Sequence, residues 1–213
     1  MKKAFLFITV ICFFGTSTIH AQTNQGKFII GTSSTISLAG SSQNFMNLGF
    51  TSSKSKSDDY TSDSDKSTNF NLQPKAGYFV IDNLVTGLDI TWIYGGSKSS
   101  EYDYKYSQTL IAFGPFVRYY IPAGSILPFF EIDGTLGTLI EKNDFTGSED
   151  KDKSRVLSFS AKAGAAIPLG DVVLFEMMML YNTASIKPKE DNNNNSRNVW
   201  NTFGINFGFI VLL

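Results

Sequence analysis

Three pairs of oppositely charged residues could do chemistry in this chain, and each pair flanks a short turn between apolar segments. The pairs are Lys75 with Asp89, Arg118 with Glu131, and Lys162 with Glu176. Each member lies about seven residues from its turn, and strands rise about 3.3 Å per residue, so antiparallel strands would bring all three pairs to a similar depth. A carboxylate beside an ammonium or guanidinium group can form a buried ion pair, move a proton or guide an ion.

The amino-terminal segment has the pattern of a cleaved secretory signal peptide. Two lysines precede the apolar run 4–15, and the small residue Ala21 follows. We expect residues 1–21 to be removed and residues 22–213 to form one β-rich domain. A transmembrane helix is disfavoured because about 20 apolar residues are needed to span a bilayer, and a lipoprotein is disfavoured because Cys12 lies within the apolar run.

Removal of this segment would limit the chemistry of the mature chain. The single cysteine, Cys12, and the single histidine, His20, would both be lost. Disulfides, Cys/His zinc sites, cysteine nucleophiles and Ser-His-Asp triads are then excluded. We expect no enzymatic activity, no catalytic residue, no cofactor and no metal. The mature chain would be mildly acidic and has no basic cluster in its sequence, so nucleic acid is not an expected partner.

Alternation of apolar and polar residues dominates from residue 26 onward and predicts an all-β fold. We expect eight strands, at 26–40, 68–81, 84–96, 106–121, 127–141, 155–168, 172–186 and 198–213. Short turns would alternate with four long polar loops, at 41–67, 97–105, 142–154 and 187–197. Short turns at one end and long loops at the other are typical of an outer-membrane β-barrel, although a soluble meander with uneven hairpins would give the same pattern.

Side-chain size indicates which face of the sheet points inward. The last predicted strand sets a row of Phe, Ile, Val and Leu against Thr202, Gly204, Asn206 and Gly208. An eight-stranded barrel has room inside only for side chains, so the small polar row suits the lumen and the large apolar row suits lipid. A soluble ligand-binding barrel would need the reverse assignment. We therefore predict an eight-stranded antiparallel up-and-down transmembrane β-barrel.

Aromatic residues near the strand ends are predicted to form two girdles at the membrane interfaces. The girdle near the long loops would contain Trp92, Tyr94, Tyr106, Tyr181 and Trp200. The girdle near the short turns would contain Tyr78, Tyr119, Phe130 and Phe175. The general preference of strands for aromatic residues would explain their presence but not their positions near strand ends.

The same orientation places the charged residues inside the barrel. A Lys or Arg that faced lipid at mid-membrane would cost about 2–4 kcal/mol, whereas one that is paired in the lumen is tolerated. We expect one network that fixes the strand register and plugs the lumen, rather than one that conducts ions or performs catalysis. Its members are Lys75, Asp89, Arg118, Glu131, Asp133, Lys162 and Glu176.

A hairpin in the first third of the chain carries a resemblance to a known family. The stretch NFNLQPKAGYFVIDNLVTGLDITW, residues 69–92, is similar to the hairpin PKxGYFVxDNLxxGL of outer-membrane β-barrel domain proteins of the Bacteroidetes. The mature chain as a whole resembles the OmpA/OmpX/OmpW-like superfamily of small outer-membrane barrels. The closing stretch TFGINFGFIVLL resembles the signal that the barrel-assembly machinery recognises, but it ends in Leu213 where that signal has an aromatic residue.

This resemblance implies a location in the outer membrane of a Gram-negative cell. The expected partners are the lipid of that membrane and, during insertion, the barrel-assembly machinery, and we expect a monomer. An even number of strands would leave both mature termini at the short-turn end, in the periplasm.

Our leading interpretation is a non-enzymatic integral outer-membrane protein with a structural, envelope-integrity or surface-interaction role. The alternative is a narrow pore or transporter for small, including hydrophobic, molecules, which a lateral opening or a cavity beside the charged network would favour. A secreted soluble binding barrel is a third interpretation. The acidic loops lack the Asp-x-Asp-x-Asp-Gly spacing of a calcium site, so we expect solvated loops there.

The predicted network can be tested by removing its cations. We expect Lys75→Met or Arg118→Met to lower resistance to unfolding or to change single-channel conductance, because each leaves a carboxylate unpaired. Denaturant titration and planar-bilayer recording measure the two properties. Two variants that matched the parent protein in both would contradict the network.

Overall fold

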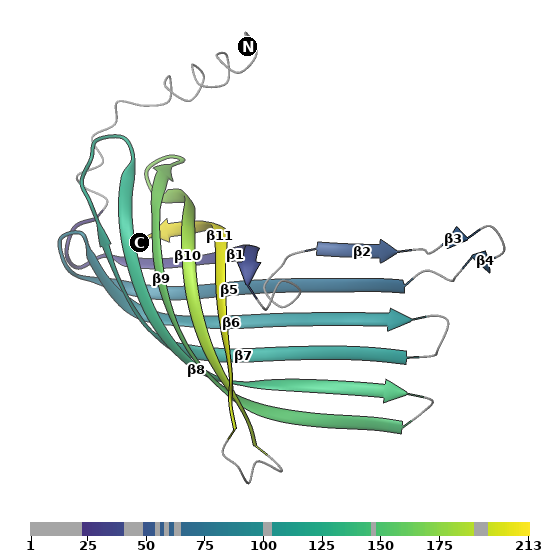
Figure 1. Cartoon of the computed structure of the whole chain (residues 1–213). Helices are drawn as coiled ribbons and strands as arrows, with labels where there is room; N and C mark the ends of the chain where they lie inside the picture. The colour runs from purple at the N-terminus through teal and green to yellow at the C-terminus, as the bar shows by residue number, and fades with distance from the viewer. Residues whose placement is uncertain are drawn as a thin grey trace.

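Eight long antiparallel strands close into an up-and-down β-barrel, which confirms the predicted fold (Figure 1). The computed structural model describes residues 23–40, 49–53, 56–57, 60–61, 65–99, 104–145, 148–189 and 196–213, and the predicted signal peptide lies outside them. The strands are β1 (Phe28–Gly40), β5 (Asp65–Ile81), β6 (Leu84–Ser99), β7 (Tyr104–Tyr120), β8 (Leu127–Phe145), β9 (Ser148–Pro168), β10 (Val173–Pro188) and β11 (Asn198–Leu212). In this part of the chain there is no helix with the length and apolar character needed to cross a bilayer.

The barrel is closed by β1, which pairs with β11 on one side and with β5 on the other. The β1–β5 ladder ends where Ser33 lies opposite Gln73. Just beyond that point, the side chain of Asn71 takes over the role of a main-chain partner. Its Oδ1 accepts a hydrogen bond of 2.6 Å from the backbone N–H of Thr35, and its Nδ2 donates one of 2.8 Å to the carbonyl of Thr35. The closure is therefore extended by a buried amide that satisfies both backbone groups of Thr35.

All four predicted polar loops contain some strand, and the two longest, 41–67 and 142–154, contain the most. β8 and β9 continue through most of 142–154, to Phe145 and from Ser148. Within 41–67, β2 (Gly49–Ser53) pairs along the outer end of β5, while β3 (Lys56–Ser57) pairs with β4 (Tyr60–Thr61) (Figure 1). The loop boundaries were placed by polarity, but backbone pairing does not require apolar side chains, so the ladders extend beyond the apolar part of the strands.

The first short turn also holds the chain segment that precedes β1. Asn83 adopts a left-handed backbone conformation with φ 66°, which Asn tolerates better than most residues. Its backbone N–H donates a 2.8 Å hydrogen bond to the carbonyl of Thr23. At the other end of the chain, Phe28 and Leu213 exchange backbone hydrogen bonds of 3.0 and 2.9 Å. Both ends of the described barrel therefore lie beside the short turns.

The outer face of the barrel carries the large apolar row, as the alternation predicts. Leu88, Phe113 and Ile132 are 63%, 65% and 63% exposed. The residues that alternate with them in β6 to β8, such as Asp89 and Ala112, are buried. This arrangement is the reverse of a soluble barrel, in which the apolar row would fill the interior.

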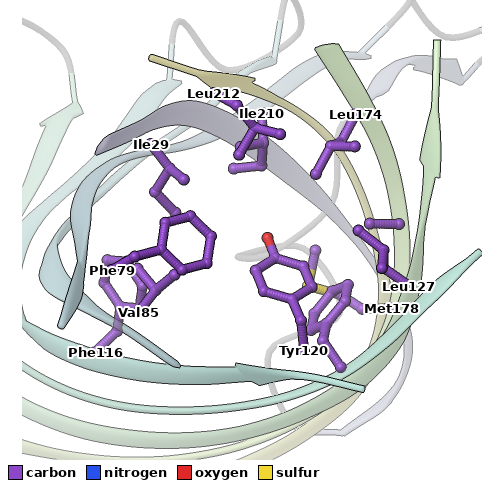
Figure 2. Close-up of a cluster of buried hydrophobic side chains, with 12 residues drawn as sticks. Ile29, Phe79, Val85, Phe116, Tyr120, Leu127, Leu174, Met178, Ile210 and Leu212 are labelled. Atoms are coloured by element: carbon purple, nitrogen blue, oxygen red, sulfur yellow. The ribbon is translucent and has the colours of Figure 1, made fainter. Parts of the chain in front are cut away.

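The interior is not lined only by small and polar residues, and in this respect the prediction was incomplete. At the short-turn end the lumen is filled by large apolar side chains, and Figure 2 shows them pointing toward one another from different strands. They include Ile29, Phe79, Val85, Phe116, Tyr120, Leu127, Phe129, Leu174, Met178, Ile210 and Leu212. A second inward cluster toward the long-loop end contains Ile93, Leu110, Ala112, Leu139, Val156 and Ile186.

Two of the nine predicted girdle residues face the lumen instead of the outside. Tyr106 shares its face of β7 with buried Gln108, and its hydroxyl donates a 2.7 Å hydrogen bond to Glu141. Trp200 shares its face of β11 with buried Thr202 and packs against the second apolar cluster. The girdle was assigned from position along the strand, whereas the alternation of side chains decides which face a residue occupies.

The two faces can be tested at adjacent phenylalanines of β8. Phe129 is 1% exposed in the lumen, whereas Phe130 is 60% exposed on the outside. We expect Phe129→Ala to cost about 3–5 kcal/mol of unfolding free energy, because it leaves a cavity in a packed cluster. The matched Phe130→Ala variant should cost clearly less. Urea unfolding in lipid vesicles measures both, and equal losses would contradict the assignment of the faces.

Candidate functional site

The carboxylate of Glu131 is the centre of the charged site inside the barrel. Its Oε1 lies 2.6 Å from Nζ of Lys75 and 2.9 Å from Nζ of Lys162. Its Oε2 accepts a 2.7 Å hydrogen bond from Nε of Arg118 and lies 2.6 Å from Nη2 of the same guanidinium. One carboxylate thus contacts three cations, and all four side chains are buried.

Strand register explains why these side chains meet. Arg118 on β7 and Lys162 on β9 both lie directly opposite Glu131 on the strand between them, so all three share the inward face. Lys75 belongs to β5 and reaches Glu131 from across the lumen. It also lies directly opposite Asp89 on β6, with 4.0 Å between its Nζ and Oδ2 of Asp89.

The other two acids are held at either side of this centre. Nζ of Lys162 lies 2.8 Å from Oδ2 of Asp133 and 3.7 Å from Oδ2 of Asp89. Arg118 uses its remaining guanidinium nitrogen, Nη1, to pair with Glu176 and to donate a 2.7 Å hydrogen bond to the hydroxyl of Tyr120. The structure therefore brings all seven predicted residues into one connected set of ion pairs.

The predicted pairing of Lys162 with Glu176 is wrong. Lys162 lies opposite Leu180, and Glu176 lies opposite Ala166. The β9–β10 hairpin is centred at residue 171, whereas this pair would need a centre at residue 169. The predicted turn at 169–171 is close to the observed one, but the midpoint of Lys162 and Glu176 lies two residues before the centre of the hairpin. Glu176 pairs with Arg118 across the lumen instead.

Tyr120 is a member of the site that the sequence analysis did not include. Its hydroxyl donates a 3.1 Å hydrogen bond to Glu176 and accepts the bond from Arg118. Tyr120 is two positions after Arg118, so both side chains occupy the same face of β7, and this spacing could have identified Tyr120. The guanidinium of Arg118 also lies 4.2 Å from the ring centre of Phe129. The network therefore contacts the apolar cluster at the short-turn end.

Three acids of the site lie close enough together to hold a metal ion, but the ammonium group of Lys162 lies between them. Oxygen atoms of Asp89, Glu131 and Asp133 all lie within 4.8 Å of one another. Nζ of Lys162 is within 3.7 Å of all three carboxylates. The ammonium group therefore supplies the positive charge that a metal would bring, and the arrangement is that of an ion-pair network.

A small cavity lies between the charged network and the second apolar cluster. Its volume is about 40 Å³, and its walls include Asp89, Asp133 and Lys162 on one side and Ile93 and Trp200 on the other. Such a volume holds about three water molecules. The network next to this polar space contains three basic and four acidic side chains.

Comparison with known proteins identifies the family of the chain. The outer membrane protein beta-barrel domain family matches residues 20–210. The chain belongs to this family. The crystal structure of Neisserial surface protein A (NspA) is 16% identical, with a TM-score of 0.46 and coverage of 88% of this chain and 97% of that chain. The N-terminal β-barrel domain of Pseudomonas aeruginosa OprF is 10% identical, with a TM-score of 0.40 and coverage of 89% and 98%. A search of curated protein sequences gave no match.

Membership of the outer membrane protein beta-barrel domain family implies the Gram-negative outer membrane as the location. It also explains why the exposed face of this barrel is apolar while its charges are inside. In hydrocarbon, each backbone polar group must be satisfied within the protein, which a closed ladder of strands achieves. An outward Lys or Arg at mid-membrane would cost about 2–4 kcal/mol, so the inward face is where Lys75, Arg118 and Lys162 are tolerated.

Two buried glutamates of the network allow a matched test. We expect Glu131→Gln to cost about 3–5 kcal/mol of unfolding free energy, because it leaves buried cations without their shared anion. Glu176→Gln should cost less, since Arg118 keeps its bonds to Glu131. Urea unfolding in lipid vesicles, followed by tryptophan fluorescence, measures the difference. If Glu176→Gln were the more damaging change, Glu131 would not be the centre of the network.

Proposed function

We propose that this protein is a non-enzymatic integral outer-membrane protein whose lumen is filled. It would contribute to the structure of the envelope and present its long-loop end for interaction. The observation that carries this proposal is the succession of three packed layers inside the barrel, an apolar cluster, the ion-pair network and a second apolar cluster. The cavity between the upper two layers has a volume of about 40 Å³.

The packing of these layers argues against an easily opened pore. Phe79, Tyr120 and Phe129 are at most 1% exposed and stack in sequence, with ring centres 6.1 and 5.6 Å apart. A water path past them would have to separate these rings and also break the bonds of Arg118 and Glu131. Breaking a buried ion pair costs about 3–5 kcal/mol, so spontaneous opening would be rare.

The absence of enzymatic activity is part of the proposal and rests on the sequence. The single His and the single Cys both lie in the segment that we expect to be removed. The remaining candidate acids and bases are engaged with one another in the network, where they hold the strands together. An acid or base that acts on a substrate must instead be within reach of the substrate proton.

The proposal also includes export and orientation. Residues 1–21 would direct export and be cleaved, and the barrel-assembly machinery would insert the mature chain. The short turns, together with the ends near Thr23 and Leu213, would face the periplasm. A monomer is favoured because the eight long strands close into a barrel by pairing of β1 with both β11 and β5.

A second candidate function is a narrow pore or transporter for small hydrophobic molecules, and one feature of the wall favours it. A groove of about 540 Å³ on the barrel wall is lined by Val117, Ile132, Phe159 and Tyr181, and it reaches Asp133 and Ser160. The same two polar residues line the inner cavity. Nearby, the β7–β8 ladder is interrupted between the pairs Phe113 with Leu136 and Phe116 with Asp133.

The size of the inner cavity makes this second candidate the weaker one. Sites for drug-sized molecules usually have volumes of about 300–1,000 Å³, whereas the inner cavity is about 40 Å³. A molecule that entered from the wall groove would therefore find no chamber inside unless the charged layer rearranged.

Planar-bilayer recording separates the two candidates. We expect the inserted protein to show no stepwise conductance, since each layer of the lumen is packed. Insertion is checked in the same preparation by a shift in gel mobility on boiling, because a closed barrel stays folded in detergent until heated. Stepwise currents, or entry of a hydrophobic dye into protein-containing vesicles but not into empty ones, would favour the pore and contradict the filled lumen. Recovery of the protein in the soluble fraction would contradict both candidates.

A further inference from the structure

Between Asp150 and Arg155, acidic and basic residues of β9 alternate and so occupy opposite faces of the strand. Ser154 and Val156 are buried on the inward face, so Lys151, Lys153 and Arg155 lie on the outward face, and all three are exposed. Asp150 and Asp152 fall on the inward side by the same alternation. Residues 150–155 therefore place their three bases on the outward face and their two acids on the other face.

Neighbouring strands extend this outward basic surface. Lys142 on β8 lies directly opposite Lys151, and Lys187 on β10 lies directly opposite Arg155. Lys189 follows, with its backbone N–H bonded to the carbonyl of Lys153. We call this surface the basic face, and its members are Lys142, Lys151, Lys153, Arg155, Lys187 and Lys189, all exposed.

A groove continues the basic face toward β6. Lys98 and Lys105 lie directly opposite each other on β6 and β7, and both are exposed. Together with Lys142 they line a groove of about 500 Å³, which also contains hydroxyl groups, among them Ser107, and one acid, Asp144. Asp144 on β8 lies directly opposite Lys105, so this groove contains three lysines and one acid and keeps an excess of basic groups.

The basic face borders the apolar band. Arg155 is two residues from the outward Leu157, which is about 7 Å along a strand. Leu136 on β8 is directly opposite Leu157 and is also exposed. When this band spans hydrocarbon, the basic side chains stand at the level where lipid headgroups carry their phosphates.

We propose that the basic face binds the phosphate groups of anionic lipid headgroups in the leaflet around the long-loop end. This inference rests on the proposed function, because it needs the barrel to lie in a membrane. A lipid fits the surface better than a soluble anion, since its acyl chains would cover the exposed leucines while its phosphate meets the lysines. Each basic side chain near an anionic surface strengthens binding by about fivefold.

Lipid binding by the purified protein in neutral detergent tests the proposal. Native mass spectrometry compares phosphatidic acid with phosphatidylcholine of the same acyl chains. We expect preferential binding of phosphatidic acid, and a loss on the order of 100-fold in its affinity for the variant Lys151→Gln, Lys153→Gln, Arg155→Gln. The matched control, Asp150→Asn with Asp152→Asn, changes the other face of the same strand and should keep the preference.

Several outcomes would overturn the proposal. Equal binding of the two lipids would do so, as would undiminished phosphatidic acid binding by the triple variant. Inorganic phosphate that displaced the lipid at equal concentration would show a site for free anions instead. Boiling-dependent gel mobility shows that each variant is folded, and Lys153→Gln alone, expected to lose about fivefold, replaces the triple variant if that one does not fold. A parent protein that stayed out of membranes would contradict the proposed function, which is a separate result.

Discussion

The buried carboxylate of Glu131 is the interaction on which the rest of the barrel depends. An eight-stranded barrel leaves room inside only for side chains, so a charge placed there finds its partners among other side chains. Glu131 finds them on β7, β9 and β5, and its contact with Lys75 spans the lumen. These contacts fix the register of neighbouring strands and join opposite walls, because a shift of one residue would turn each charge toward the outside.

The apolar clusters above and below the network follow from the same limit on space. Polar residues could fill those layers only with further buried bonds, whereas Phe79, Tyr120 and Ile93 fill them by packing. The outer face then faces hydrocarbon, and the long strands β8 and β9 extend past it, with Lys142, Lys151 and Lys153 exposed on the outward face. Because the interior is filled and the exterior has an apolar band bordered by basic residues, a function that uses the outer surface of the protein is favoured.

Features that depend on the alternation of side chains along a strand could be predicted from the sequence. Contacts across the lumen could not. The eight strands and the inward row that includes Lys75 and Asp89 follow from a period of two residues. Trp200 was misassigned because strand position was used in place of alternation. Lys162 and Glu176 were paired wrongly because their midpoint, residue 169, is two residues before the centre of the hairpin. The contact of Lys75 with Glu131 joins strands that are not neighbours, so no local pattern in the sequence contains it.

Quenching of tryptophan fluorescence by brominated lipid tests the central claim most directly, because the chain has only two tryptophans and they face opposite ways. Trp92 is 45% exposed on the outer face, while Trp200 packs inside against the second apolar cluster. In vesicles of lipids brominated on their acyl chains, the Trp200→Phe variant, which retains Trp92, should be strongly quenched. The Trp92→Phe variant, which retains Trp200, should be quenched little. The opposite pattern would contradict a barrel with its apolar row toward lipid and its charges around the axis.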